Sequence, residues 1–324
     1  MVRRIKIKFV DFWSDFNFED NFIINILREK YICELSDNPD YLFFSTFGNR
    51  HLHYKCVKIM YIGENVFPDF NICDYAMAFD WLDLGDRYMR LPIYLIRDNF
   101  KDFRINYDID CEAVLNRKFC SIVVSNIKHA NPMRELFFKK LSTYKKVDSG
   151  GRVWNNVGGP VTDKHQFISQ YKFNIAFENS SSLGYTTEKI MDAMIAQCIP
   201  VYWGDPLVHK NFNPEAFINV DNYRDVDEAV DYIVELDKNN ELYLDMLRKP
   251  KVINKKMFDW EKEVYVFLTN IIDKPIDKAK YITDYGMQKL YRRNLMYADF
   301  VGNRLKINKI YSAFQTLKQN LGWF

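Results

Sequence analysis

Residues 173–204 of this 324-residue chain read FNIAFENSSSLGYTTEKIMDAMIAQCIPVYWG. Apolar side chains alternate over residues 173–177 and predict a buried strand, with the polar Glu178 at its carboxyl end. A Ser/Gly loop then leads to two threonines at 186–187, which are suitable helix N-caps, and a second apolar run follows the helix at 199–203. Strand, loop, helix and strand in this order are typical of an α/β sheet, whose ligands bind outside the carboxyl ends of the strands.

The helix in this stretch begins with Glu188 and Lys189. A helix N-terminus offers free N–H groups and the positive end of a dipole to an anion. Lys189 is electrostatically unfavourable for that helix end, so we expect a negative group beside it, and a diphosphate would satisfy this need. The alternative is a solvated surface pair, which is the usual fate of a Glu-Lys pair at a helix start.

Length and composition indicate a globular protein of about two domains. Hydrophobic residues make up 48% of the chain, too many for a disordered protein, and the formal charge of +2 gives no electrostatic reason to expect nucleic acid as a partner. Six cysteines without a CxxC spacing predict neither a zinc site nor a disulfide framework. The first eight residues alternate charged with apolar types, unlike a signal peptide, and no run approaches ~20 apolar residues, so we expect a cytoplasmic protein.

Alternating strand and helix patterns predict two α/β domains, over residues 1–115 and 116–275, with a linker within 91–114. In the first domain we expect strands at 5–9, 41–45, 57–62 and 75–79 and a helix within 20–31. In the second we expect strands at 119–125, 144–148, 172–178, 199–203 and 217–220, and helices at 132–142, 163–170, 187–197, 226–236, 242–247 and 260–272. Tyr202 and Trp203 are interpreted as core residues.

A basic amphipathic tail is predicted for residues 276–324. From Asp277 onward nine Lys/Arg stand against three Asp, a local charge of +6, and apolar residues form one helical stripe between 307 and 321. Two interpretations remain open: a helix lying on an anionic inner membrane, on its cytoplasmic face, or a helix packed on the protein itself or on a partner.

Several motifs resemble the signature of the α-1,3/α-1,4-fucosyltransferases, including the bacterial enzymes that build Lewis-type antigens. The similar segments are FENS at 177–180, YTTEKI at 185–190, PVYWG at 200–204, FCSIVVSN at 119–126, YKKVDSGGR at 144–152, residues 212–220, and YIGEN at 61–65 followed by CDYA at 73–76. The resemblance covers roughly residues 57–245. It implies a GT-B fold, two Rossmann-like domains facing across a cleft, with the GDP-fucose donor on the second domain and the acceptor on the first.

The resemblance also implies a role in the donor site for seven residues. They are Arg152 and Lys189 at the diphosphate, Glu188 at the fucose hydroxyls, Asn179 and Tyr185 along the donor, and Ser125 and Asn126 at the nucleotide or its phosphates. The chemistry is consistent with this allocation, because departing GDP is an anion that needs charge stabilisation, and Arg binds phosphate bidentately.

Glu64 is carried over as the general base, since one carboxylate within hydrogen-bond reach can take the proton of an attacking hydroxyl. The Asp-x-Asp triplets at 108–110 and 225–227 imitate metal-binding motifs, but the second begins a helix, where Asp is an ordinary residue. We therefore expect no metal ligand and no required cofactor, and any stimulation by Mn²⁺ or Mg²⁺ would occur without a dedicated site.

The function expected from the sequence is inverting transfer of L-fucose from GDP-fucose to a hydroxyl, O3 of GlcNAc or glucose, on an oligosaccharide or lipopolysaccharide. Two alternatives remain: a GT-B transferase that uses another nucleotide sugar, and a non-catalytic module that binds glycan or membrane. The heptad repeats of some bacterial members are absent from the sequence, which leaves the oligomeric state open.

Overall fold

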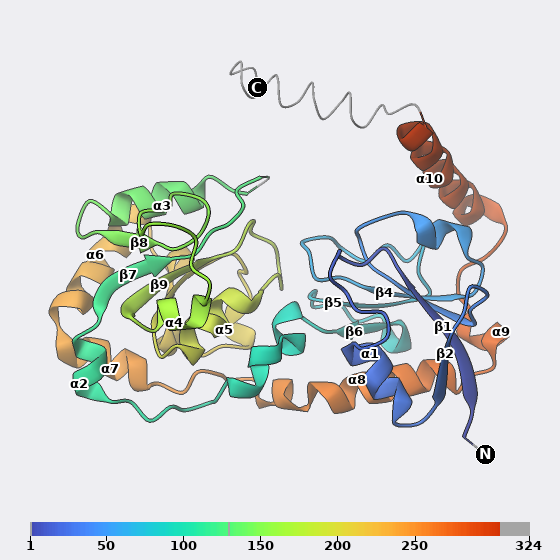
Figure 1. The fold of residues 1–324 in the computed structure, drawn as a ribbon, viewed down its shortest axis with the longest axis horizontal. Helices are drawn as coiled ribbons and strands as arrows, with labels where there is room; N and C mark the ends of the chain where they lie inside the picture. Colours follow the sequence, from blue (N-terminus) through green and yellow to red (C-terminus); the bar gives the residue numbers. More distant parts are fainter. Residues whose placement is uncertain (1, 129, 305–324) are drawn as a thin grey trace. The chain divides into compact units, whose positions relative to one another are not determined.

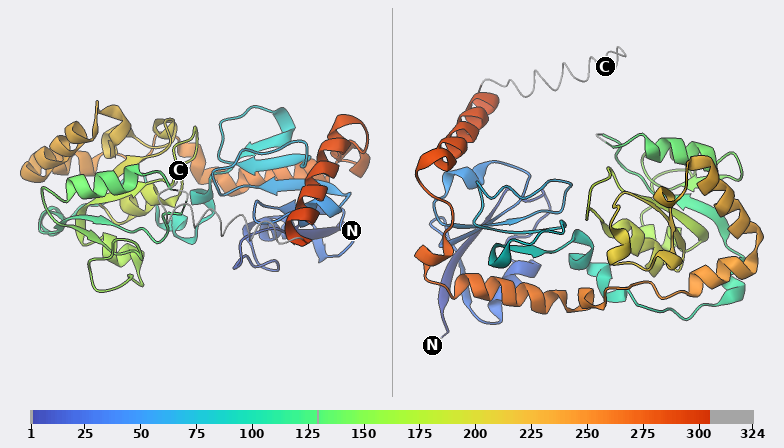
Figure 2. Two further views of the ribbon diagram at one scale, coloured as in Figure 1. Left: turned by 90° about the horizontal axis from the view of Figure 1, so that it is seen from above. Right: turned by 180° about the vertical axis from the view of Figure 1, so that it is seen from behind.

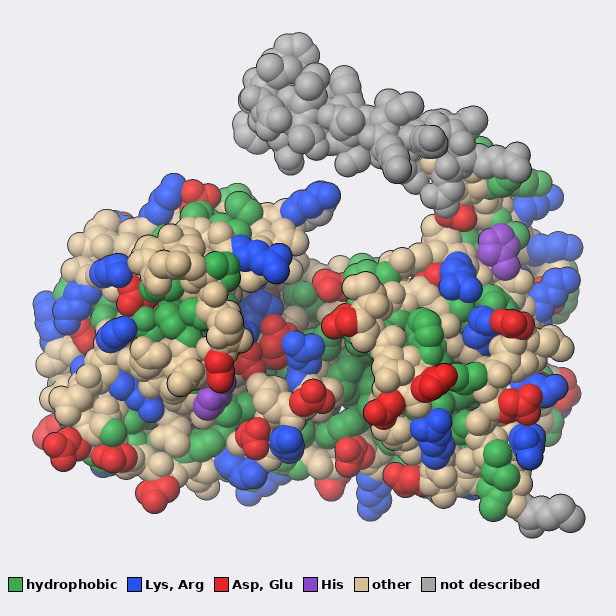
Figure 3. All heavy atoms as spheres, viewed as in Figure 1, with side chains coloured by type: hydrophobic (Ala, Val, Ile, Leu, Met, Phe, Trp, Pro, Cys, Tyr) green, Lys and Arg blue, Asp and Glu red, His purple; other side chains and the backbone are tan. Residues whose placement is uncertain are grey.

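A computed structural model describes residues 2–128 and 130–304 and divides the chain into two compact units, each built around one β-sheet (Figure 1). Unit 1 contains the described residues up to Ala78, Asp83–Met89 and the described residues from Glu261 onward. Unit 2 contains Phe79–Leu82 and Arg90–Trp260. The chain therefore leaves unit 1, and later returns to it. Basic and acidic side chains are interspersed over the face drawn in Figure 3, as the nearly balanced charge leads one to expect.

The sheet of unit 1 has six strands in the order β2-β1-β3-β4-β5-β6. Their bounds are β1 Arg4–Val10, β2 Ile32–Leu35, β3 Tyr41–Phe44, β4 Val57–Tyr61, β5 Tyr75–Ala78 and β6 Tyr88–Arg90. Neighbouring strands from β2 to β5 pair in parallel. Every residue of β3, β4 and β5 is buried, as is usual for parallel strands that are covered on both faces.

The helices of unit 1 come from both ends of the chain. Helix α1 covers Phe22–Arg28, and Asn21 caps it by accepting hydrogen bonds from two backbone amides. Helix α8, Trp260–Ile272, ends against the first strands: the carbonyl of Ile272 accepts from the Arg3 guanidinium at 2.6 Å and from the Tyr41 hydroxyl at 3.1 Å.

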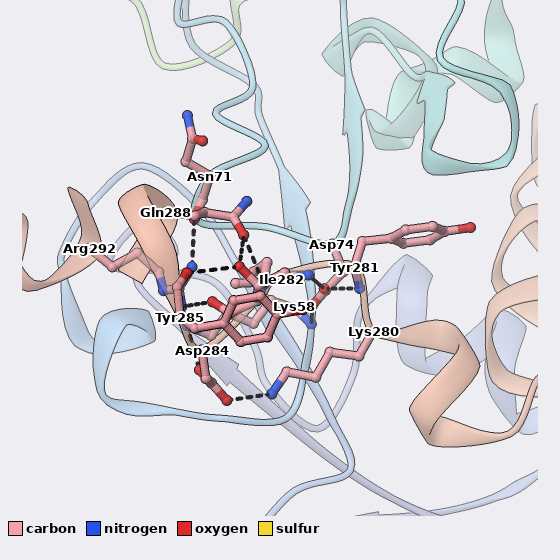
Figure 4. A network of polar contacts seen from close by, with 11 residues as sticks. Lys58, Asn71, Asp74, Lys280, Tyr281, Ile282, Asp284, Tyr285, Gln288 and Arg292 are labelled. Atoms are coloured by element: carbon pink, nitrogen blue, oxygen red, sulfur yellow. Dashed lines mark hydrogen bonds and ion pairs between the residues drawn. The ribbon is translucent and has the colours of Figure 1, made fainter. Parts of the chain in front are cut away.

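A buried carboxylate fixes the segment that follows α8. Asp74 has no exposed surface and accepts hydrogen bonds from the backbone amides of Lys58, Tyr281 and Ile282 at 2.7–2.8 Å (Figure 4). Burial raises the pKa of Asp74, and these amides oppose that rise. Because a donor from β4 and two donors from the segment after α8 share one carboxylate, Asp74 ties that C-terminal segment to the sheet.

Part of the expected tail is packed on unit 1. Its elements are α9, Ile276–Ala279, and α10, Gly286–Arg304. Figure 2 shows α10 in red as one continuous helix. From α10, Arg292 donates to the carbonyl of Asn71 at 3.3 Å, and Tyr291 donates to Asp69 at 2.7 Å. The expected apolar stripe between 307 and 321 lies outside the described residues, so the two interpretations of that stripe stay open.

The sheet of unit 2 has five parallel strands in the order β11-β10-β9-β7-β8. The bounds of its elements are β7 Lys118–Ile122, β8 Val147–Ser149, β9 Tyr171–Phe177, β10 Ile199–Trp203, β11 Ile218–Asn219, α2 Cys111–Leu115, α3 Met133–Leu141, α4 Lys164–Ile168, α5 Glu188–Ile195, α6 Val226–Lys238 and α7 Asn240–Arg248. Phe173 and Ile175 of β9 belong to one core with α3, α6 and α7. Helix α5 contacts β9 and β10, and α4 packs on α5. The alternation of strand and helix expected for this region is confirmed.

The structure differs from the sequence expectation in several elements and in the division of the chain. Strand β6 and helix α2 were not predicted, and α2 begins within the stretch that was expected to be the linker. Strand β2 was not foreseen, because two of its four residues are exposed and its sequence lacks an apolar pattern. Strand β8 begins at Val147, not at 144, because Tyr144 and Lys145 instead bind the Asp237 carboxylate at 3.1 and 2.5 Å. Finally, the residues from Glu261 onward belong to unit 1, and Arg90 to residue 115 belong to unit 2. No helix of the described part of the chain is long and apolar enough to span a membrane.

Candidate active site

The candidate site lies at the carboxyl ends of β9 and β10, where the quoted stretch leaves the sheet. Phe177 pairs with Trp203 in parallel register, and the amide of Glu178 donates to the Trp203 carbonyl at 2.9 Å. Gly204 follows at φ 151°, and a Cβ built on it would lie 2.6 Å from the Cβ and Cγ of Glu178. Position 204 therefore requires glycine, because any larger residue would displace Glu178.

Glu178 organises the start of α5. Its side chain has no exposed surface. One carboxylate oxygen accepts from the Thr187 amide at 2.7 Å, and the other accepts from the Thr187 hydroxyl at 2.7 Å and the Lys189 ammonium at 2.9 Å. Thr187 occupies the N-cap position, as expected, but its hydroxyl binds Glu178 and makes no capping hydrogen bond. Glu178 was quoted in the motif without a role, because its partners become visible only when the loop is folded.

Lys189 lies between two carboxylates. Its nitrogen is 3.6 Å from a Glu188 oxygen, in addition to the Glu178 contact. Burial by itself would lower the pKa of Lys189, but Glu178 and Glu188 outweigh burial and raise that pKa above its ordinary value. Burial likewise opposes ionisation of Glu188, yet Lys189, Lys164 and Arg97 lower its pKa to about 2. The negative group expected beside Lys189 is thus protein carboxylate, and the lysine alone does not require a bound anion.

A second buried carboxylate fixes the loop before α5. Asp205 accepts from the Gly184 amide at 2.7 Å, the Thr186 hydroxyl at 2.8 Å and the Leu207 amide at 2.7 Å. Gly184 adopts φ 88°, and a Cβ there would lie 2.7 Å from the Phe79 carbonyl. Thr186 therefore serves this loop, and it does not cap the helix. Asp205 was missed in the sequence because it follows the second strand and lies 21 residues from Gly184.

Tyr185, which lies in the same loop, is buried, and its ring centroid lies 5.1 Å from that of Phe79. It follows Gly184 and precedes the two residues bound by Asp205 and Glu178, so the loop holds it near Lys189. Its phenol contributes to the raised pKa of Lys189. Asn179, in contrast, is exposed, and its carbonyl accepts from the Asn131 amide at 2.7 Å.

Arg152, Ser125 and Asn126 lie together because the loop after β8 packs on the end of β7. The Val153 amide donates to the Val124 carbonyl at 3.0 Å. A Cβ on Gly151 would lie 1.9 Å from that carbonyl oxygen, so the two backbones approach as closely as glycine allows. All three predicted side chains are exposed.

Arg134 is a buried cation that the sequence expectation missed. It lies in the first turn of α3, and two of its nitrogens donate to the Phe177 carbonyl at 3.2 and 2.6 Å. Burial lowers its pKa, although Glu178, Tyr185 and Glu188 oppose the fall. Arg134, Lys164 and Lys189 are among the residues that line a cavity of about 10 Å³, a space for one water. A buried arginine gives no sequence signal here, because its position in a helix resembles any surface arginine.

A larger cavity of about 440 Å³ adjoins Glu188 within unit 2. Its polar lining includes Arg97, Lys164 and Asp192. Lys164 binds one Asp192 oxygen at 2.5 Å, and the Asn99 amide donates to the other at 2.7 Å. This lining offers charged donors and acceptors, which suits a polyhydroxylated ligand better than an apolar one.

Glu64 lies in unit 1, whereas the seven predicted donor residues lie in unit 2. It follows β4 by three residues, at the carboxyl end of that strand, and its side chain is exposed. Its own carbonyl accepts from the Val66 amide at 2.7 Å, which turns the chain sharply after the strand.

The Asp-x-Asp triplets at 108–110 and 225–227 form helix caps. Asp110 caps α2 by accepting from the Ala113 amide, and Asp225 caps α6 by accepting from the Glu228 amide. Among the described residues, no group of three or more His, Cys, Asp or Glu side chains could hold a metal ion. Tyr202 and Trp203 are buried, as expected for core residues.

Two family models match the chain. One is described as "Alpha-(1,3)-fucosyltransferase FucT N-terminal domain" and matches residues 7–97, and the other as "Glycosyltransferase family 10 (fucosyltransferase) C-term" and matches residues 115–285. The alpha-(1,3)-fucosyltransferase FucT of Helicobacter pylori is 37% identical over 285 residues, covering 75% of this chain and 59% of its own length. This chain therefore spans less than two thirds of that relative.

A bovine relative, named 4-galactosyl-N-acetylglucosaminide 3-alpha-L-fucosyltransferase 9, is 36% identical over 158 residues, which is 46% of this chain and 42% of the relative. A crystal structure of an alpha1,3-fucosyltransferase with GDP-fucose aligns at 33% identity and a TM-score of 0.71, covering 84% of this chain and 91% of that one. The expected α/β fold of GT-B type is thereby confirmed. With more than half of its residues matched by one family model, the chain belongs to glycosyltransferase family 10, the fucosyltransferases.

Proposed function

We propose that this chain transfers an L-fucosyl group from GDP-fucose to a hydroxyl of a glycan acceptor, with inversion at the anomeric carbon. The observation that carries the proposal is the cluster of Glu178, Glu188 and Lys189 at the start of α5, flanked by the buried Arg134. Such a cluster presents cations at the carboxyl ends of parallel strands, where α/β sheets receive nucleotides.

The diphosphate would bind between Lys189 and Arg152. Lys189 stays charged because its pKa is raised, and Arg152 is exposed on a loop whose backbone is fixed against Val124. Cations placed where charge develops stabilise the departing GDP, and they do so without having to reorganise during the reaction. The exposed Ser125, Asn126 and Asn179 supply polar groups along the same edge.

The fucosyl ring would lie against Glu188 and the cavity of about 440 Å³ beside it. With a pKa of about 2, Glu188 is a carboxylate at neutral pH and accepts hydrogen bonds from hydroxyls. Tyr185 keeps the loop packed on this side of the sheet.

In the reaction, the bond from C1 of fucose to the β-phosphate oxygen breaks, and its electron pair leaves with GDP. A new bond forms between C1 and the acceptor oxygen, on the opposite face of the ring. The acceptor proton passes to the Glu64 carboxylate, which is exposed three residues beyond the end of β4. Unit 1 would therefore bind the acceptor. The name of the bovine relative points to O3 of N-acetylglucosamine in a galactosyl-N-acetylglucosaminide as the first acceptor to test.

The decisive experiment measures GDP release and glycan transfer with GDP-fucose, and compares Glu64→Gln with a matched exposed residue of unit 1, Glu19→Gln. We expect Glu64→Gln to lower kcat at least 100-fold with GDP-fucose affinity preserved, because only the base is removed. Glu19→Gln should behave as the unsubstituted chain. GDP release with GDP-mannose and none with GDP-fucose would overturn the proposed donor, and full activity of Glu64→Gln would overturn the assigned base.

A further inference from the structure

Three adjacent strands of unit 1 bring two aromatic rings to the edge of the sheet that carries Glu64. Strands β1, β3 and β4 are neighbours and all parallel, so the loops that follow them leave the same edge side by side. Trp13 follows β1, Phe47 follows β3 and Glu64 follows β4. The sequence places these residues up to 51 positions apart, and only the strand order makes them neighbours.

The two rings are neighbours, and we define Trp13 and Phe47 as the aromatic patch. The Trp13 ring centroid lies 6.4 Å from that of Phe47, with the planes at 79°. It also lies 6.4 Å from that of Tyr61, the last residue of β4 and the third before Glu64. Trp13 is half-buried over this buried tyrosine, and Phe47 is 50% exposed.

A buried polar network holds Phe47 in its exposed position. Asp11 adopts φ 59°, unusual for a residue other than glycine, and accepts from the amides of Arg50 and His51 at 3.1 and 2.9 Å. The His51 ring nitrogen Nδ1 lies 2.8 Å from the same carboxylate. The Phe47 amide in turn donates to the Asp11 carbonyl at 3.0 Å. Phe47 is therefore exposed on a loop that the fold fixes at several points.

A fixed, exposed aromatic ring at the same sheet edge as a carboxylate is suited to a sugar. A pyranose has one face of C–H groups, which packs against the electron-rich face of an aromatic ring, while its hydroxyls reach polar groups at the rim. Apolar contact with a few placed polar groups is also the general composition of small-ligand sites.

We propose that the aromatic patch is the acceptor subsite, where Phe47 packs on the C–H face of one pyranose ring of the glycan and Trp13, whose plane stands at 79° to that of Phe47, contacts the edge of the same sugar. The bound ring presents a hydroxyl toward Glu64, which its tether to Tyr61 and β4 keeps at the same edge. This inference rests on the proposed function, because it takes Glu64 as the base that receives the acceptor proton. It assigns to the patch a role in acceptor affinity and none in donor affinity.

The test compares Phe47→Leu and Trp13→Leu, which keep apolar volume but remove the ring, with the matched control Phe18→Leu. Phe18 is an exposed phenylalanine of the same unit, 43% exposed, whose ring packs on Phe9 and Phe16. Steady-state kinetics with GDP-fucose and a galactosyl-N-acetylglucosaminide give KM for each substrate, and GDP release without acceptor reports the donor site alone. We expect the acceptor KM to rise about 3–10-fold in each patch variant, with donor KM and acceptor-free GDP release unchanged, and Phe47→Tyr to restore the acceptor KM.

An unchanged acceptor KM in folded Phe47→Leu overturns the inference, as does an equal rise in the KM of GDP-fucose. If the patch instead covers a second copy of the chain, Phe47→Leu lowers the dimer fraction in sedimentation and leaves acceptor KM unaltered, which also overturns it. Should Trp13→Leu fail to fold by circular dichroism, the exposed Phe47 decides the question. Failure of the proposed function is separate, because it would show as absent GDP release from GDP-fucose by the unsubstituted chain.

Discussion

The ammonium of Lys189 lies 2.9 Å from a carboxylate oxygen of Glu178, a side chain with no exposed surface. The same carboxylate holds both the amide and the hydroxyl of Thr187, so one buried charge fixes the first turn of α5 and its cation together. A buried ion pair of this kind costs desolvation, and removal of one partner leaves the other charge uncompensated. Glu178 is thus a positioning residue for Lys189.

Glu178→Gln should make the Lys189 charge sensitive to alkaline pH. Burial lowers the pKa of Lys189, and the loss of Glu178 removes the largest group that opposes burial. A lysine with a raised folded-state pKa contributes stability that is present below its ordinary value of 10.5 and lost as pH rises through the folded-state pKa. We expect the variant to lose about 2–3 kcal/mol of stability at pH 7, and the alkaline limb of GDP binding to move at least one pH unit lower. Chemical denaturation and calorimetric titration with GDP measure the two effects.

The matched control for Glu178→Gln is Glu135→Gln, which breaks an exposed pair with Lys139 in the same unit. Exposed pairs contribute little, so this variant should stay within about 0.5 kcal/mol and keep the unsubstituted pH profile of GDP binding. An alkaline limb that does not move in Glu178→Gln would contradict the positioning role.

Gly151→Ala should displace Arg152. A Cβ at Gly151 would lie 1.9 Å from the backbone oxygen of Val124, and this backbone atom, two residues beyond the end of β7, cannot move cheaply. We expect GDP affinity to fall about tenfold or more because Arg152 leaves the diphosphate. Gly158→Ala in the same loop is the control: its φ of 91° strains alanine by about 1 kcal/mol, but no atom lies within 4 Å of the new Cβ, so GDP affinity should be retained. Equal GDP affinity of the two variants would show that the loop does not set the position of Arg152.

Asp205→Asn should loosen the loop that carries Tyr185. Asn has one acceptor oxygen, whereas the carboxylate of Asp205 binds Gly184 and Leu207 with one oxygen and Thr186 with the other. We expect about 2 kcal/mol of destabilisation and faster hydrogen exchange at the Gly184 amide. Asp163→Asn, at the N-cap of α4, should be neutral, because Asn caps helices as well as Asp does. Unchanged exchange at Gly184 would refute this role of Asp205.

Lys58→Met should stabilise unit 1 at neutral pH. Lys58 is buried, and burial lowers its pKa to about 8, although Cys56 and Asp74 oppose the fall. Folding then penalises the charged form fully below pH 8, and the penalty fades between pH 8 and the ordinary value of 10.5 as the folded state releases its proton. Thermal unfolding should show a gain of about 2–3 kcal/mol at pH 7 that shrinks by pH 9.5. The exposed Lys55→Met should change nothing, and a gain for Lys58→Met that is independent of pH would point to packing instead of charge.

Local patterns in the sequence were enough to predict the elements that form the site. Strand β10 has the bounds that were expected, and β9 and α5 differ by one or two residues at each end. Outside the site, helix α8 also has its expected bounds. The residues that complete the site are harder to foresee. Arg134 binds a carbonyl 43 residues away, and Asp205 binds an amide 21 residues away, so neither contact has a local signature.

The assignment of residues to the two units also could not be predicted from local sequence patterns. Helix α8 has the same apolar periodicity whether it covers the nearer sheet or the distant one. Its placement depends on the carbonyl of Ile272, which receives Arg3 from 269 residues earlier and Tyr41 from 231 residues earlier. Hydrogen bonds between residues so far apart in the sequence cannot be predicted from composition or from the spacing of apolar residues.

The contacts of Arg3 and Tyr41 with the Ile272 carbonyl affect the order in which the two units can fold during synthesis. Arg3 and Tyr41 are synthesised early with strands β1 and β3. The carbonyl of Ile272, to which both side chains donate, is synthesised more than 230 residues later. Unit 2 is almost continuous, from Arg90 to Trp260, and all of it has been synthesised before α8 is complete. Domains generally fold as units during synthesis. Unit 2 can therefore complete its fold first, while the N-terminal strands of unit 1 still await helix α8.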